Sequence, residues 1–185
     1  MRLIVGITGA SGVVLAVELL KRLREIDSVE THLIITKGAE VTVRDETDFD
    51  VSDIRRLADY VYDVNQSDAS IASGSFRVDG MIVVPCTMKT LAGIASGYSE
   101  NLLLRAADVC IKERRKLLLV PREMPFSPIH LRNMKDLADC GAIIMPPVMT
   151  FYHKPATIDA QIDHIVNKML RLFNLPDTMV EWQPR

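Results

Sequence analysis

Short, uninterrupted apolar runs alternate along this chain with longer segments in which apolar residues recur at helical spacing. The runs contain almost no polar alternation, as in Met81-Ile82-Val83-Val84. Runs of this kind are typical of strands that are buried on both faces of a parallel sheet. We predict strands at residues 2–7, 31–36, 80–85, 116–120 and 142–145.

Helical periodicity fills the segments between these runs. Residues 101–114 show it well, because their apolar side chains fall on one stripe and most of their charges lie outside it. We predict helices at residues 12–25, 38–46, 52–60, 88–96, 101–114, 127–139 and 158–173. Regular alternation of strands and helices predicts right-handed crossovers. The fold class is therefore α/β, an open doubly wound parallel sheet of the flavodoxin or Rossmann-like three-layer α/β/α type.

Chain length and composition predict one globular domain. The 185 residues suffice for a full core, and the hydrophobic fraction of 48% is ordinary for a globular protein. We assign residues 1–175 to the domain and residues 176–185 to a C-terminal tail, which contains the single Trp182 and is expected to pack at a subunit contact. The polar segment 62–79 is expected to form a long active-site loop.

Charge and cysteine content exclude several classes of partner. A net charge of -2 gives no electrostatic reason to bind nucleic acid or an anionic membrane, and no apolar stretch approaches the length of a membrane span. Three widely spaced cysteines suit reduced thiols, and residues 1–12 do not resemble a secretory signal. We therefore expect a cytoplasmic protein without a metal site, since the four histidines show no metal-binding spacing.

The first predicted strand runs into a glycine-rich turn and then into a helix. Such a turn presents free backbone N–H groups and the positive end of a helix dipole, which favours phosphate. The spacing of Gly6, Gly9 and Gly12 differs from the dinucleotide fingerprint, and the second strand ends in Thr36 rather than in an acidic residue. We interpret the turn as a mononucleotide phosphate site with Ser11 in reach, although it can also be a simple connection.

Three further strand ends carry candidate chemistry at the same predicted edge. Thr87 follows the third strand and either caps a helix or faces a ligand as well. Arg122 and Glu123 follow the fourth strand, where they can bind phosphate and move a proton, or form an ordinary surface ion pair. Tyr152 lies in a proline-rich loop after the fifth strand, where its ring either covers a ligand or closes the core. Lys168 reads as a solvated helix residue from its pattern alone.

An ordered set of motifs along nearly the whole chain resembles the flavin prenyltransferase family, the UbiX-like proteins formerly described as small subunits of aromatic-acid decarboxylases. The segments that carry the resemblance are residues 6–12, 46–47, 73–76, 85–92, 105–108, 112–114, 121–125, 129–131 and 151–152. Any one of these motifs is weak, but the ordered set is specific. The chain departs little from the residues that are common in this family: Thr36 stands where Ser is common, and Lys168 stands where Arg is frequent. Residues 87–90 resemble the branch tied to hydroxyaryl-acid decarboxylation.

The resemblance implies that the chain binds FMN, assembles into a homododecamer and has active sites at subunit contacts. It implies that reduced FMN receives a dimethylallyl group from dimethylallyl monophosphate at N5 and C6, and that the prenylated FMN serves a separate UbiD-type decarboxylase. The residues implied to hold FMN are Gly9, Ala10, Ser11, Thr36, Thr87, Met88, Lys89, Thr90 and Arg122. The residues implied to bind the prenyl substrate are Arg105, Lys112, Tyr152 and Lys168, and those implied to be catalytic are Ser11, Glu46 and Glu123.

Two other functions fit parts of the sequence. One is an FMN-dependent decarboxylase of cysteine-containing substrates, which shares the fold, but His32 lies inside a predicted strand rather than at a catalytic position. The other is a non-catalytic FMN-binding subunit of a hydroxyaryl-acid decarboxylase complex. A mere carrier leaves Glu46, Glu123, Tyr152 and Lys168 without a role.

Overall fold

The computed structural model describes residues Met1–Met179. The chain forms two compact units, Met1–Pro146 and Pro147–Arg185. The first unit contains the whole sheet, and the second contains one long helix and the loop before it. The assignment of residues 1–175 to one domain stays a prediction, and Trp182 lies outside the described residues.

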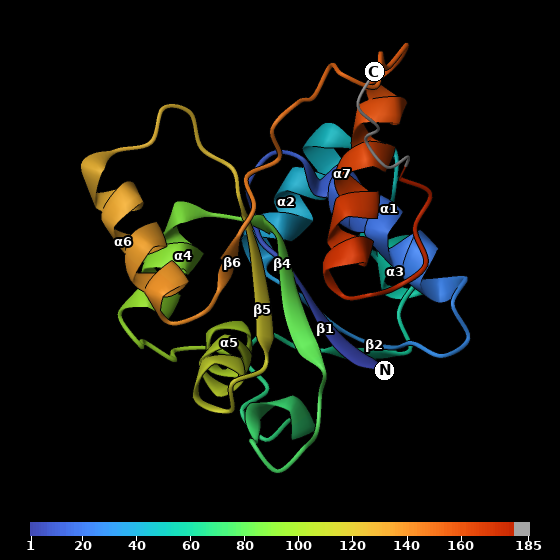
Figure 1. The fold of residues 1–185 in the computed structure, drawn as a ribbon. Coiled ribbons are helices and arrows are strands. Elements are labelled where there is room, and N and C mark those ends of the chain that lie inside the picture. Colours follow the sequence, from blue (N-terminus) through green and yellow to red (C-terminus); the bar gives the residue numbers. More distant parts are fainter. Residues whose placement is uncertain (180–185) are drawn as a thin grey trace. The chain divides into compact units, whose positions relative to one another are not determined.

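A six-stranded, all-parallel sheet organises the first unit, with the strand order β3-β2-β1-β4-β5-β6. The strands are β1 (Arg2–Ile7), β2 (Glu30–Ile35), β3 (Tyr60–Tyr62), β4 (Gly80–Cys86), β5 (Lys116–Pro121) and β6 (Ile143–Ile144). The chain builds outward from β1 first on one side and then on the other, as Figure 1 shows for β2 and β4. This reversal makes the sheet doubly wound and confirms the fold class predicted from the sequence.

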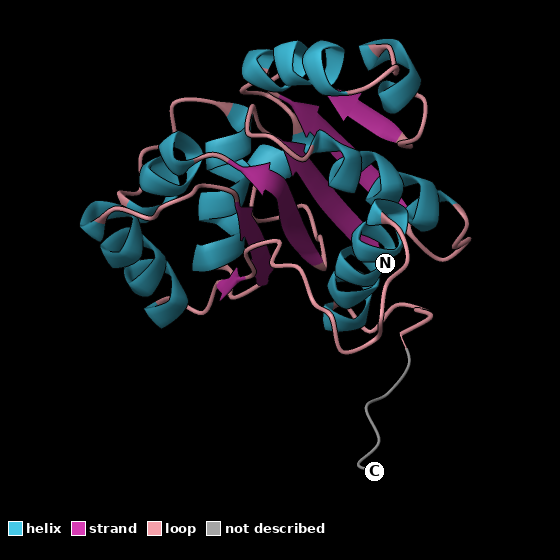
Figure 2. Cartoon of the chain, turned by 90° about the horizontal axis from the view of Figure 1, so that it is seen from above, coloured by secondary structure: helices cyan, strands magenta, loops and turns pink. Residues whose placement is uncertain are grey.

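In the first unit, helices connect the strands and cover both faces of the sheet, as Figure 2 shows in cyan and magenta. In the first unit they are α1 (Val13–Arg24), α2 (Lys37–Glu46), α3 (Val51–Arg55), a 3-10 turn η1 (Ser70–Ala72), α4 (Met88–Ala95), α5 (Leu102–Lys112) and α6 (Pro128–Asp139). The second unit contributes α7 (Ile158–Leu172). Side chains of Thr36, Thr87, Asn101 and Ser127 accept hydrogen bonds from the first turns of α2, α4, α5 and α6. These caps explain why the helices begin where they do.

The predicted helix at 52–60 is wrong in its second half. Helix α3 ends at Arg55, and Tyr60–Tyr62 forms the edge strand β3, which pairs with His32 through Ile34 of β2. A strand of three residues is too short to display a period, so its aromatic and β-branched composition was the only available signal.

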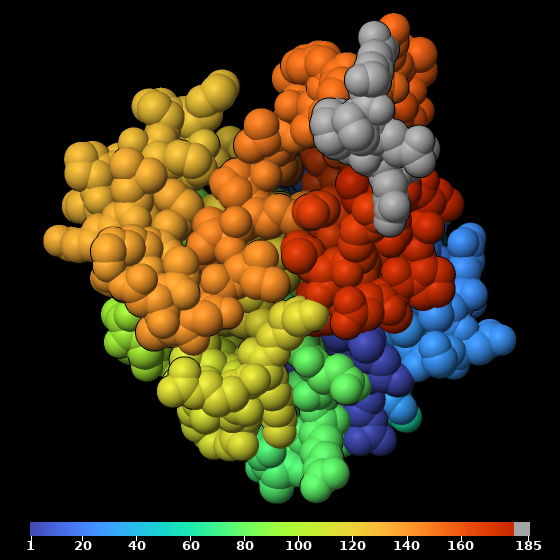
Figure 3. Space-filling view, in the orientation of Figure 1, coloured from blue at the N-terminus to red at the C-terminus, as the bar shows by residue number. Residues whose placement is uncertain are grey.

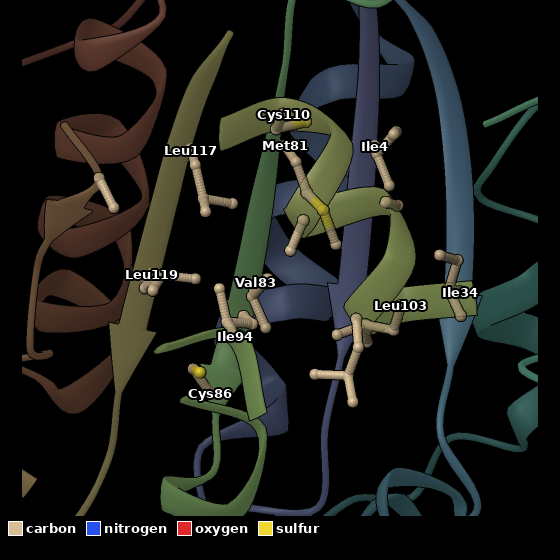
Figure 4. Packing of buried hydrophobic residues seen from close by; sticks show 14 of the residues in the cluster. Ile4, Ile34, Met81, Val83, Cys86, Ile94, Leu103, Cys110, Leu117 and Leu119 are labelled. Atoms are coloured by element: carbon tan, nitrogen blue, oxygen red, sulfur yellow. The ribbon is translucent and has the colours of Figure 1, made fainter. Parts of the chain in front are cut away.

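Apolar side chains of β1, β4 and β5 pack against α4 and α5 to form the core on one face of the sheet (Figure 4). Met81, Val83, Leu117 and Leu119 are all fully buried there. Each such side chain contributes about 1.5–3 kcal/mol relative to an exposed one. Burial also raises the pKa of the Cys86 and Cys110 thiols to about 12, so both thiols stay protonated and serve as core side chains.

Candidate functional site

A cavity of about 990 Å³ opens at the carboxyl edge of the sheet, beyond the ends of β1, β2 and β4. Its walls come from the turns that follow these strands, from the first turns of α2 and α4, from the link between α4 and α5, and from one side of α6. The volume is at the upper end of the range for small-molecule sites. The cavity lies where open α/β sheets bind ligands.

The turn after β1 is fixed by a close approach of two backbones. A Cβ atom on Gly9 would lie 2.6 Å from the carbonyl carbon of Gly38, so no larger residue fits without moving backbone. Gly12 precedes α1 with φ of 99°, in the left-handed region that favours glycine. The two glycines therefore have different tasks: one permits contact between β1 and α2, and the other starts a helix.

Thr8 joins the ends of β1 and β4 and is almost completely buried. Its Oγ1 donates to the carbonyl oxygen of Pro85 at 2.7 Å and accepts from the backbone N–H of Thr87 at 2.8 Å. One hydroxyl thus satisfies two backbone groups and sets the spacing between two turns of the cavity. Sequence analysis missed this residue, and a threonine inside a glycine-rich turn was the only signal.

Two helix N-termini point their first turns at the cavity. The Oγ1 of Thr36 accepts from Ala39 N at 3.2 Å, and the Oγ1 of Thr87 accepts from Thr90 N at 3.1 Å. Both residues also line the cavity, so capping and ligand contact are compatible at these positions. Lys37 and Lys89 line the same cavity and add positively charged ammonium groups. Free N–H groups, positive dipole ends and lysines together make an electropositive site.

The predicted FMN-binding residues fall into two groups. Those that line the cavity are Gly9, Thr36, Thr87, Lys89 and Thr90. Those that lie outside its lining are Ala10, Ser11, Met88 and Arg122. Ser11 and Arg122 are exposed, and the backbone N–H of Arg122 donates to Cys86 O at 3.2 Å, which holds the turn after β5 beside the end of β4.

The two predicted catalytic carboxylates lie on different elements. Glu46 is the last residue of α2, and its carboxylate accepts a hydrogen bond from Gly12 N at 2.8 Å. Because Gly12 directly follows Ser11, this bond brings the carboxylate close to Ser11. Glu123 is exposed on the turn after β5, and its Oε1 accepts from Met124 N at 3.2 Å. Glu46 and Ser11 therefore lie together at the turn after β1, whereas Glu123 lies on a separate turn.

The two predicted cations on α5 are separated by almost the whole helix. Arg105 lies near its start, where it lines a hollow of about 410 Å³ that shares Asn65, Glu100 and Asn101 with the main cavity. Its guanidinium pairs with Asp108 at 2.7 Å. Lys112 is the last residue of the helix, separated by three residues from β5 (Lys116–Pro121), which begins at the amino edge, and it pairs with Glu113. Within one chain, Lys112 is therefore at the opposite edge from the cavity.

The predicted active-site loop 62–79 divides between the two edges of the sheet. Only Val64 and Asn65 line the main cavity. Further on, the carbonyl oxygens of Gly74 and Phe76 accept from the guanidinium of Arg115 at 2.6 and 2.9 Å, and that residue directly precedes β5. The second half of this loop therefore lies away from this chain's own cavity and beside Lys112, whose Nζ would be 2.8 Å from a Cβ atom on Gly74.

Helix α6 contributes a wall that the sequence did not reveal. Its lining residues are Ile129, Arg132, Asn133 and Asp136. The link between α4 and α5 adds Tyr98, Glu100 and Asn101. Apart from Ile129, which belongs to the 129–131 motif, these positions carry no local motif, and only the packing of the elements brings them to the cavity.

The second unit contains the remaining two predicted substrate residues. Tyr152 is 60% exposed, and its hydroxyl lies 3.2 Å from Nε2 of His164 on α7. Lys168 is exposed one turn further along the same helix. Burial lowers the pKa of His164, the neighbouring His153 and Lys168 lower it further, and Asp163 raises it, so the net effect favours the neutral form.

Residues Met1–Met179 contain neither a membrane-spanning helix nor a cluster of metal-binding side chains. No helix in this part of the chain is long and apolar enough to cross a membrane. Among the same residues, no group of three or more His, Cys, Asp or Glu side chains is arranged to hold a metal ion.

Comparison with known proteins identifies the family. The model of the Flavoprotein family matches residues 1–174. A probable UbiX-like flavin prenyltransferase of Sedimentibacter hydroxybenzoicus is 58% identical over 175 residues, which cover 95% of this chain and 93% of the relative. The flavin prenyltransferase UbiX of Salmonella typhimurium is 49% identical over 185 residues, with 98% of each chain covered.

Solved structures agree with these sequence relatives. A structure of a UbiX protein (PadA1) in complex with FMN and dimethylallyl pyrophosphate superposes with a TM-score of 0.94 at 50% identity, covering 98% of both chains. The dodecameric FMN-dependent UbiX-like decarboxylase of Escherichia coli O157:H7 superposes with a TM-score of 0.97 at 50% identity, covering 100% of both chains. Peptidyl-cysteine decarboxylases such as EpiD share only the fold, at 17% identity. The cavity at the carboxyl edge and these similarities together show that the chain belongs to the Flavoprotein family and, within it, to the UbiX-like flavin prenyltransferases.

Proposed function

We propose that this flavin prenyltransferase binds reduced FMN in the cavity at the carboxyl edge and joins to it a dimethylallyl group from dimethylallyl monophosphate. The observation that carries the proposal is the convergence of the β1 turn, two helix N-termini and two lysines on one cavity. Relatives that are about half identical to this chain have the same activity in their names.

The chemistry of the cavity fits FMN. A flavin mononucleotide combines an anionic phosphate with a flat, largely apolar ring that has a polar edge. Backbone N–H groups of α2 and α4 and the hydroxyls of Thr36, Thr87 and Thr90 suit the polar parts. Val64, Leu104 and Ile129 supply apolar wall. When bound, reduced FMN provides the N5 and C6 atoms that accept the prenyl group.

Within this proposal the protein positions the flavin and manages protons. Gly9, Thr36, Thr87, Lys89 and Thr90 hold FMN from the cavity wall, and Ala10, Ser11, Met88 and Arg122, which lie outside the lining, are assigned to any part of FMN that extends beyond it. Glu46 fixes the turn that carries Ser11 through its hydrogen bond to Gly12. Glu123 moves a proton between the flavin and the departing phosphate, which is the task of a carboxylate placed at a reacting centre.

Cations stabilise the negative charge that grows on the phosphate as its C–O bond breaks. We assign this task to Arg105, Lys112 and Lys168, with Tyr152 adding a hydrogen bond. A monophosphate leaving group balanced by three side-chain cations needs no divalent metal. Lys168 acts as a point charge here, since an ammonium does not form the bidentate pair that arginine makes.

The position of Lys112 supports a shared site. Because this residue lies at the amino edge, it serves a cavity of another copy rather than its own, and the enzyme works as a homo-oligomer, for which we propose a dodecamer. A structure that superposes along the whole chain is described as dodecameric. Met124 and the α6 residue Leu131 are exposed apolar side chains available to such contacts, and α6 lies in the gold-coloured surface in Figure 3.

We place the enzyme in the cytoplasm, where its three free cysteines stay reduced. Its product serves a separate UbiD-type decarboxylase of aromatic acids. The motif at residues 87–90 favours a hydroxyaryl-acid decarboxylase as that client.

The test is an anaerobic assay of the purified protein with reduced FMN and either dimethylallyl monophosphate or dimethylallyl pyrophosphate, followed by mass spectrometry of the extracted flavin. We expect a flavin heavier by one five-carbon prenyl unit with the monophosphate. Glu123→Gln should slow its formation and leave FMN binding intact. An unmodified flavin with both donors would overturn the proposal.

A second candidate function is decarboxylation by the chain itself, because two solved structures similar to it are described as decarboxylases. The phenylacrylic acid decarboxylase of Aquifex aeolicus is 34% identical, with a TM-score of 0.88 and coverage of 96% of this chain. Incubation of the FMN-loaded protein with hydroxybenzoic and phenylacrylic acids, without a prenyl donor, separates the two functions. Release of carbon dioxide would favour the second candidate, and a protein that only binds FMN in both assays would be a carrier.

A further inference from the structure

The loop that precedes α7 presents Tyr152 without the support of a core. Residues 148–152 are mostly exposed, and Val148, Met149 and Phe151 are each at least 64% exposed. A tyrosine ring in such a loop has no packing that fixes its direction. Its orientation must therefore come from the few side chains that contact it.

Two imidazoles provide these contacts. The ring of Tyr152 meets the ring of His164 edge to face at 5.6 Å and 78°, and it meets the ring of His153 at 5.4 Å and 71°. The hydroxyl oxygen lies 3.2 Å from Nε2 of His164. The ring and its hydroxyl are thus both engaged by α7.

The His153 ring holds His164 in place. The two imidazoles stack at 4.3 Å with an interplanar angle of 12°. On its other side, His153 Nδ1 lies 3.2 Å from Oγ1 of Thr150. Thr150 is in turn fixed to α7 by Gln161, whose Nε2 donates to Thr150 O at 2.6 Å and whose Oε1 accepts from Thr150 N at 3.2 Å. The chain of contacts begins and ends on α7, so the loop segment is closed against the helix.

We propose that His164 is a positioning residue of the prenyl-transfer reaction, which holds the Tyr152 hydroxyl so that it can hydrogen-bond the phosphate of the prenyl donor. The proposal rests on the substrate role assigned to Tyr152 above. A tyrosine hydroxyl has one proton to donate, and a neutral His164 that donates from Nε2 leaves that proton for a phosphate oxygen. Stacking of two imidazoles at 4.3 Å is compatible with neutral rings, since two cations at that distance would repel.

The groups around His164 within this unit act on its pKa in both directions: burial, His153 and Lys168 lower it, and Asp163 raises it, with a net lowering. The charged and titratable groups are His153, Asp163, Lys168 and the phenol of Tyr152. Lys168, one turn along α7, is the cation that we assign to the same phosphate. A neutral imidazole next to it keeps the site from carrying two adjacent positive charges.

The experiment compares His164→Leu, which removes the hydrogen bond, with His164→Gln, whose amide nitrogen reaches about where Nε2 stands. Binding of dimethylallyl monophosphate to the FMN-loaded protein is measured by calorimetry, and kcat and KM are measured separately. We expect His164→Leu to weaken binding by about five- to tenfold, as the loss of one hydrogen bond implies, and His164→Gln to recover most of it. Asp159→Asn, exposed in the first turn of the same helix, serves as the matched control and should leave binding unchanged.

Tyr152→Phe and the double variant Tyr152→Phe/His164→Leu complete the design. If His164 acts through Tyr152, the double variant binds no more weakly than Tyr152→Phe alone. Additive losses would overturn the positioning role and leave the role of Tyr152 intact. An effect of Tyr152→Phe without any effect of His164→Leu would do the same. Unchanged binding in Tyr152→Phe would overturn the substrate role of Tyr152 and the role of His164 with it.

Discussion

The turn after β1 and the loop before α7 both carry residues assigned to the reaction, but the two segments are held in opposite ways. At the turn after β1, backbone packs on backbone at Gly9 and Gly38, and the buried hydroxyl of Thr8 joins two strand ends. At the loop, Tyr152 is held by side chains alone. The first site is preformed whether or not a ligand is present, whereas the second depends on one hydrogen bond and two ring contacts.

Gly9→Ala, in the turn after β1, should have the largest effect on stability and on FMN binding. The new Cβ atom would fall 2.6 Å from backbone that cannot give way as a flexible side chain does. We expect a loss of about 3 kcal/mol in the free energy of unfolding and a large loss of FMN affinity, measured by denaturant titration and flavin fluorescence. The matched control is Gly38→Ala, whose Cβ would lie at an ordinary 3.5 Å from Gly9 Cα. Equal behaviour of the two variants would contradict this account.

Thr8→Val should weaken the same segment by a smaller amount. The substitution keeps the shape of the side chain but leaves the partly buried Thr87 N–H without its acceptor. A loss of about 1 kcal/mol follows from the removal of this hydrogen bond. Thr8→Ser retains the hydroxyl and should lose less. Thermal unfolding measures the stability of both variants. A Thr8→Val variant as stable as the native chain would show that the hydroxyl is dispensable.

Gln161→Met tests the loop rather than the turn. Methionine has a similar length but cannot form the two hydrogen bonds to Thr150, so the loop should detach from α7. We expect about 1 kcal/mol of lost stability and weaker binding of the prenyl donor with FMN affinity unchanged. Gln66→Met, at an exposed position in the first unit, is the control. A simultaneous loss of FMN binding would mean that the two segments are not independent.

The smallest effect is expected from pH. The pKa of His164 is lowered from 6.5 in the folded chain, so the unfolded chain binds the proton more readily. Stability from this group is therefore complete above about pH 6.5 and falls as the pH drops below it, until the pH passes the folded pKa. His164→Gln should reduce this dependence below about pH 6.5 in thermal unfolding. An identical pH profile for the variant would contradict the assignment.

The strands β1, β4 and β5 and most of the turn after β1 were predictable from the sequence. Uninterrupted apolar runs gave β1, β4 and β5, and the glycine spacing placed the turn at Gly9. Those signals are local and repeat along the chain. The three-residue strand β3 escaped because it is shorter than the period that would reveal it.

Features that need contacts between distant segments were not predictable. Arg132 and Asp136 reach the cavity only because α6 packs beside α4, and no pattern in residues 128–139 announces this. The His153–His164 stack likewise joins residues eleven positions apart through ring geometry that no spacing rule encodes. The resemblance to a family gave Tyr152 and Lys168 their roles, but not the contacts that hold the tyrosine.

The unequal burial of the cysteines has a practical consequence for all of these experiments. Cys86 and Cys110 are buried with thiol pKa values of about 12, whereas Cys140, just after α6, is exposed. A maleimide reagent needs an accessible thiolate, so in the folded chain it should attach a fluorophore at Cys140 alone. The chain thus carries a built-in handle for single-site labelling, and uptake of a second or third label would report unfolding of the core directly.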